Sequence, residues 1–143
     1  MTKFLLLLIA FCALAVADDP GGWSAAKWGM TREQIADAVR DPQIDIDGQR
    51  WAATYSYDEA GRLVAVRLTP ASRNDHTARD YLRAELRLVE IYGRPFSRHI
   101  ESVRAAMWSL PTTIITLMHE DLRPTVAVQT LSITYRMRQP PKL

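Results

Sequence analysis

Cysteine is nearly absent from this 143-residue chain, and its single cysteine, Cys12, lies inside an N-terminal apolar run. The rest of the chain therefore has no disulfide and no thiolate metal site. Metal ligands of other kinds are also poorly arranged, because His76, His99 and His119 show no spacing typical of a metal site. The position four residues after His119 is Arg123, so no H-E-x-x-H motif is present. We therefore expect no bound metal.

Signatures of catalysis are missing as well. Ser109 lies outside any G-x-S-x-G turn, and the few glycines form no phosphate-binding loop. Residues 45–48 resemble the middle of a calcium loop, but the register that aligns the glycine places Gln43 and Thr54 where carboxylates are required. We assign no catalytic residue and no cofactor, and we expect a protein that is not an enzyme.

An excess of one charge is absent too. The chain has 18 basic and 16 acidic residues, a formal net charge of +2, and its arginines are spread along the sequence. No electrostatic footprint for nucleic acid follows from this distribution. A small basic cluster at the C-terminal end, Arg136, Arg138 and Lys142, is more typical of a frayed terminus than of a membrane-binding site.

The N-terminus has the pattern of an export signal. Lys3 precedes the apolar run 4–14, and the segment Ala15-Val16-Ala17 comes directly before two aspartates. A basic start, a short apolar core and an A-x-A ending are typical of a cleavable signal peptide, and the core is shorter than the roughly 20 residues that span a bilayer. We predict a signal peptide at residues 1–17, cleavage before Asp18, and a periplasmic or secreted protein with no transmembrane span in its mature chain.

The remaining chain has the length of one domain. Residues 18–27 are rich in glycine and predict a flexible lead-in, in which Trp23 could be exposed. Residues 28–138 carry the periodic patterns and predict a single α+β domain, and residues 139–143 form a proline-containing tail.

A capping box predicts the first helix. Thr31 can accept a hydrogen bond from the backbone of Gln34, whose side chain can reach back, while Met30 can pack on Ile35 as a hydrophobic staple. The pattern predicts a helix over residues 32–40, which must end before the following Asp-Pro pair.

Alternating apolar and polar residues predict strands. Residues 50–57 and 62–68 alternate with period two on either side of the turn at 58–61, which predicts a β-hairpin. Later in the chain, three further strands are expected at about residues 100–108, 112–119 and 127–137.

A longer helix separates these two groups of strands. It begins near residues 74–77 and runs to about Tyr92, where Gly93 ends it. One broad arc of this helix is apolar and consists of Ala78, Tyr81, Leu82, Leu86, Leu88, Val89 and Tyr92. Glu85 projects into the middle of this arc. We expect Glu85 to be a buried polar residue that is reached by an arginine, a tyrosine hydroxyl or a tryptophan N–H from the sheet. The alternative is a helix rotated so that Glu85 lies at the edge of the contact.

Together these elements predict an α+β fold with the order αββαβββ, in which two helices pack on one face of an antiparallel sheet of about five strands. Leu131, Ile133 and Tyr135 would point toward the helices from the last strand. The residues that alternate with them should face away from the helices and are our candidate interaction surface: Thr130, Ser132, Thr134 and Arg136.

Four short motifs carry a resemblance: residues 28–31 (W-G-M-T), 57–63 (Y-D-E-A-G-R-L), 92–95 (Y-G-R-P), and Trp108 before 113–117 (T-I-I-T-L). Together they resemble an uncharacterised family of small exported bacterial proteins. The helix-then-meander plan is also similar to the small lipoprotein of the outer-membrane β-barrel assembly machinery and to secreted β-lactamase-inhibitor proteins. Both bind proteins and neither is an enzyme. This chain lacks a convincing lipid-attachment cysteine and lacks cysteines for disulfides, which separates it from each.

Two functions from different classes remain open. The first is a non-catalytic binding module of the bacterial envelope, whose partner is another envelope protein held at the open sheet face or an edge strand. The alternative is a small-molecule or lipid carrier that uses a cavity between the helices and the sheet. The sequence leaves the oligomeric state open.

Overall fold

The computed structural model describes residues 18–72, 78–123, 125 and 129–139. The predicted signal peptide at residues 1–17, His76 and the end of the predicted tail, residues 140–143, lie outside the described residues. So do the expected start of the second helix at 74–77 and residues 127–128 of the expected last strand.

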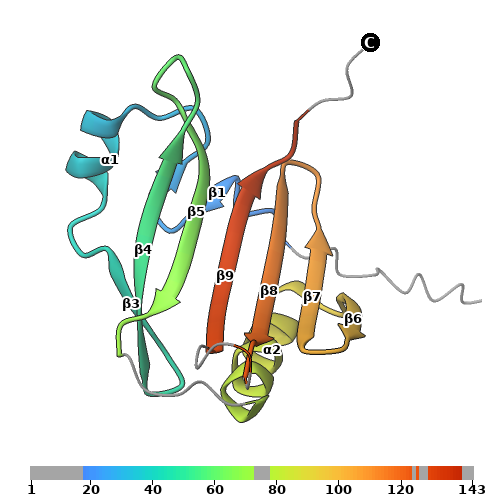
Figure 1. The fold of residues 1–143 in the computed structure, drawn as a ribbon. Coiled ribbons are helices and arrows are strands. Elements are labelled where there is room, and N and C mark those ends of the chain that lie inside the picture. Colours follow the sequence, from blue (N-terminus) through green and yellow to red (C-terminus); the bar gives the residue numbers. More distant parts are fainter. Residues whose placement is uncertain (1–17, 73–77, 124, 126–128, 140–143) are drawn as a thin grey trace, which may run out of the picture.

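A seven-stranded antiparallel sheet dominates the structure, and a separate two-stranded sheet lies beside it (Figure 1). The order in the large sheet is β3-β4-β5-β9-β8-β7-β6. In chain order the elements are β1 (Gly22–Trp23), β2 (Ala26–Lys27), α1 (Arg32–Ala38), β3 (Gln43–Ile46), β4 (Gln49–Tyr57), β5 (Leu63–Pro70), α2 (Ala78–Tyr92), β6 (Phe96–Ile100), β7 (Val103–Ser109), β8 (Thr113–Asp121) and β9 (Gln129–Met137).

The predicted αββαβββ order with a sheet of about five strands is therefore wrong. One cause is a turn inside the expected strand 100–108, where Glu101 adopts a left-handed φ of 51° and separates β6 from β7. Another is β3, which pairs with β4 through the two-residue turn Asp47-Gly48. Both turn residues have positive φ, as a two-residue hairpin of this type requires, and the Asp45 carboxylate accepts from the Gly48 amide at 2.8 Å.

The expected flexible lead-in is instead a small hairpin packed on the core. β1 pairs with β2 in antiparallel register, and Trp23 is only 5 % exposed. The carboxylate of Asp19 accepts from the Gly21 amide at 3.0 Å, from the Thr112 amide, and from the Thr113 hydroxyl at 2.8 Å. These contacts join the N-terminal segment to the turn between β7 and β8. Burying an indole there outweighs the conformational freedom that glycine would allow.

The local predictions near the first helix and hairpin are confirmed. Thr31 Oγ1 accepts from the Gln34 amide at 3.3 Å, and the Gln34 side chain accepts from the Thr31 amide at 2.8 Å, which completes the capping box of α1. The helix ends at Ala38, a little earlier than expected. β4 and β5 pair from Trp51 opposite Pro70 to Tyr57 opposite Leu63, with a bulge near the end.

The core lies on one face of the large sheet. Four strands contribute a continuous row, in which Leu117 lies between Ala106 and Ile133, and Ile133 lies next to Leu68. Helix α2 crosses this face at β8 (Figure 1) and buries Tyr81, Ala84 and Leu88 against it. Elsewhere the core is aromatic, and both Trp51 and Trp108 are almost fully buried. No helix of the described residues has the length and apolar character needed to cross a membrane.

Candidate functional site

The predicted polar row occupies the sheet face opposite the core. Pairing places Thr134 between Arg67 of β5 and Thr116 of β8, while its neighbours Ile133 and Tyr135 lie in the core. Exposure along the row is uneven. Arg136 is exposed, Thr130 and Thr134 are half-buried, and Ser132 is only 7 % exposed. The row therefore offers a partner less accessible surface than strand alternation alone predicts.

A more exposed surface lies at the sheet edge formed by β6. All five residues of β6 are exposed, and Phe96 leaves 67 % of its surface accessible. On the face away from the core, Phe96 pairs with Met107 of β7, and Ile100 lies two positions beyond Arg98. All three of these apolar side chains are exposed. Large apolar side chains gathered at a free edge are typical of an interaction surface.

Helix α2 adds apolar side chains beside this edge. The expected apolar arc is wrong for Leu82 and Leu86, which are 48 % and 65 % exposed. The helix is rotated so that Ala84, which we had not placed in the arc, is buried instead. Both exposed leucines follow Glu85 around the same flank of the helix. We call the set Phe96, Ile100, Met107, Leu82 and Leu86 the β6 edge surface.

Glu85 marks the boundary between this surface and the core. It is half-buried, and its carboxylate accepts a hydrogen bond from the Ser97 hydroxyl of β6 at 3.3 Å. The arginine, tyrosine or tryptophan partners that we considered do not supply this contact. The helix rotation that we named as the alternative accounts for the position of Glu85, because it moves the carboxylate to the edge of the buried stripe.

A second feature appears on the core face, near the start of α2. Strand pairing places Arg104 of β7 directly between His99 of β6 and His119 of β8. The three side chains come from three consecutive strands, and the register of the two hairpins brings them into one row. They help to line a surface hollow of about 340 Å³. We call this hollow, with its row of His99, Arg104 and His119, the Arg104 pocket.

Neighbouring groups influence the electrostatics of this pocket. Burial raises the pKa of Tyr81 to about 12, the Glu85 carboxylate adds to the rise, and Arg104 opposes it. The Tyr81 ring lies 6.5 Å from the His119 ring between centroids. Tyr81 therefore stays protonated at neutral pH and places an uncharged ring next to His119, one of the residues that line the hollow.

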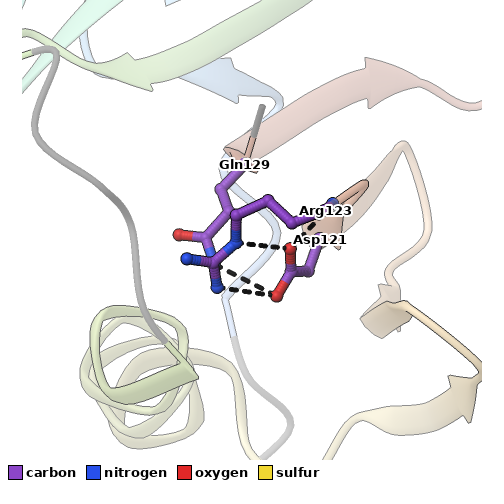
Figure 2. Close-up of polar contacts among 3 residues, drawn as sticks. All are labelled: Asp121, Arg123 and Gln129. Carbon is purple, nitrogen blue, oxygen red and sulfur yellow. Dashed lines mark hydrogen bonds and ion pairs between the residues drawn. The ribbon is translucent and has the colours of Figure 1, made fainter. Parts of the chain in front are cut away.

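At the far side of the pocket, Asp121 is held by two side chains (Figure 2). Arg123 Nε donates to Oδ1 at 2.9 Å, Arg123 Nη2 donates to Oδ2 at 2.9 Å, and Gln129 Nε2 donates to Oδ2 at 3.1 Å. The hydrogen bonds from Arg123 are the main reason that the pKa of Asp121 lies well below its ordinary value. The acceptor atoms of Asp121 are thus already used.

Within the described ranges, no group of three or more histidine, cysteine, aspartate or glutamate side chains could hold a metal ion. Comparison with known proteins found no matching family model, no matching curated protein and no matching solved structure. The case for a function therefore depends on the geometry of the chain itself.

Proposed function

We propose that the protein is a non-catalytic binding module of the bacterial envelope that accepts an extended segment of another envelope protein as an added strand on β6. The observation that carries the proposal is the β6 edge surface. An edge strand leaves backbone N–H and C=O groups without a strand partner on one side, and here exposed apolar side chains lie on both faces of that edge. Backbone hydrogen bonds and apolar contacts would form together.

Charge indicates the chemistry of the partner. Arg98 lies on β6, Arg94 lies just before it, and β6 itself has no acidic residue. An extended segment with acidic and apolar residues fits this edge best. Antiparallel pairing of two β6 strands centred on Arg98 would place two arginines opposite each other, which is destabilising.

The opposite edge of the sheet is a weaker candidate. Strand β3 has four residues, and Ile44 is its one large apolar side chain in the exposed class. It carries Asp45, whose charge is complementary to that of Arg98. A second copy that docks β3 onto β6 is therefore a competing occupant, and its signature would be concentration-dependent association.

The carrier alternative has less support. The space between α2 and the sheet is occupied by buried side chains, with Tyr81, Ala84 and Leu88 on the helix and Leu117 and Leu131 on the strands. A lipid-sized ligand would have to displace them, at the large cost of opening a packed core.

A charge-reversal pair tests the docking edge. We expect Arg98→Glu to weaken binding of a purified envelope partner at least about tenfold, because it places a carboxylate against an acidic strand. Arg67→Glu is the matched control, since Arg67 is an exposed arginine on the same sheet face but in the central strand β5. Its effect should remain within about twofold. Affinity is measured by calorimetry after the partner is captured from the envelope fraction and identified.

Hydrogen exchange then locates the contact. Bound partner should protect the amides of residues 96–100. Equal losses for the two charge reversals, or protection at 130–136 in place of 96–100, would move the interface to the predicted polar row. Sedimentation of the protein alone tests the second-copy arrangement, and a lipid recovered with the purified protein would favour the carrier.

Export is the other part of the proposal. We expect cleavage between Ala17 and Asp18, because small residues occupy both recognition positions of the predicted signal peptide. N-terminal sequencing of the protein from the periplasm or the medium should begin Asp18-Asp19-Pro20, and the fraction that contains it separates a periplasmic from a secreted protein. Recovery of an intact Met1 terminus in the membrane fraction would contradict this prediction.

A further inference from the structure

A feature independent of strand docking is the Arg104 pocket. Directly paired residues in an antiparallel sheet have side chains about 5 Å apart, so His99, Arg104 and His119 can reach a common group. We propose that this pocket binds the oxyanion group of a small ligand, a carboxylate or a phosphate. The guanidinium of Arg104 supplies the principal donors, and the imidazoles stand on either side of it.

Arg104 carries the inference because no residue in the described part of the chain accepts a hydrogen bond from its guanidinium. Its side chain is half-buried, yet within the described part of the chain it makes neither a hydrogen bond nor an ion pair. A partly desolvated guanidinium with five N–H donors is best satisfied by an anion, and its planar fork matches two oxygens of a carboxylate or phosphate.

The two acids that line the pocket, Asp121 and Glu101, do not serve as acceptors for Arg104. Asp121 already accepts from Arg123 and Gln129 (Figure 2), so the pair that it forms with Arg123 is locally neutral. Glu101 lines the rim from the turn between β6 and β7 and is exposed to solvent. The donors of Arg104 thus remain available to a ligand.

The size of the pocket limits the ligand. A hollow of about 340 Å³ can hold a phosphate group or a small carboxylic acid, but most of a larger molecule would extend into solvent. Arg104 is close enough to Tyr81 to lower its pKa, and Ser102 and Glu101 also line the hollow. Recognition is therefore of the anionic group and not of a whole molecule.

Titration of the exported, purified protein tests this inference. Inorganic phosphate and acetate are added separately at constant ionic strength, and the backbone amide shifts are followed by NMR. We expect saturable shifts that are largest at residues 99, 104 and 119. Saturation by phosphate alone identifies a phosphate site, and saturation by acetate alone identifies a carboxylate site.

Variants at two arginines decide whether Arg104 is responsible. Arg104→Met should weaken binding at least about tenfold, as expected for loss of a charged hydrogen-bond donor. Arg98→Met removes the same charge from the other face of the neighbouring strand and should change affinity less than about twofold. If Arg104→Met fails to fold, Arg104→Lys takes its place in the test. It keeps the charge but lacks the planar fork, so it should bind the anion more weakly than the unmodified protein. Non-saturable shifts, or equal affinities in the Met variants, would overturn the site.

Discussion

Replacing Leu117 by alanine should lower the free energy of unfolding by about 2–5 kcal/mol, the range typical of a buried leucine. Leu117 is 0 % exposed and lies between Ala106 and Ile133 in the middle of the sheet. Its neighbours belong to strands that are held by hydrogen bonds on both sides, so they can collapse only partly into the space left behind. The loss is a large fraction of the 5–15 kcal/mol that stabilises an ordinary domain.

Leu86 provides the matched control for this measurement. The same substitution at Leu86, which is 65 % exposed, should change stability by less than about 0.5 kcal/mol. Urea unfolding of both variants at one pH gives the comparison, and similar slopes would show that both changes act on the native state. A Leu117→Ala protein as stable as Leu86→Ala would contradict the location of the core.

Asp19→Ala should lower the free energy of unfolding by about 2–3 kcal/mol at neutral pH, because it removes an acceptor that joins the N-terminal segment to β8. The hydroxyl of Thr113 donates to Asp19 and also accepts from Trp28 Nε1 at 3.0 Å. Thr113 is fully buried, so its hydroxyl would lose the acceptor at 2.8 Å, keep only the more distant Thr112 hydroxyl at 3.3 Å, and gain no water. Asp18→Ala is the control, since Asp18 is exposed and adjacent in sequence; its effect should remain below about 0.5 kcal/mol.

The cost of Asp19→Ala should also depend on pH. Partial burial alone raises the pKa of Asp19, but the amides and hydroxyls that donate to the carboxylate outweigh it and lower the pKa below the ordinary value of 3.8. The folded state therefore binds this proton less readily than the unfolded state. The stabilisation is fully present above pH 3.8 and is lost as the pH falls through the lower folded-state pKa. The difference between the two proteins should shrink below about pH 4, and a difference independent of pH would contradict this explanation.

Short-range signals predicted several elements correctly. The Thr31 capping box and the hairpin of β4 and β5 depend on residues close in sequence, so they can be recognised before any tertiary contact is known. The alternation in β9 also separates its two faces correctly: Leu131, Ile133 and Tyr135 lie in the core, and Thr134 faces the other way.

Other local signals were present but were interpreted incorrectly. The Asp47-Gly48 pair is a strong hairpin signal, yet we considered it only as part of a calcium loop and missed β3. The Glu101-Ser102 turn has no glycine or proline, so nothing in residues 96–109 indicated two strands. The hairpin of β1 and β2 was hidden for a different reason, because its stability comes from burying Trp23 against distant strands.

The sequence by itself determined the local elements and the alternation of polar and apolar faces, because each depends on side chains within a few residues of one another. Only the tertiary structure decided that β5 lies beside β9, that α2 turns Leu82 and Leu86 outward, and that His99, Arg104 and His119 form one row. Strand register and helix rotation follow from how distant surfaces fill one shared core, and a single-residue change in register would move every side chain of a strand to the opposite face. The outward position of Leu82 and Leu86 in the β6 edge surface arises from that long-range choice, whereas the register of two consecutive hairpins sets the row of the Arg104 pocket.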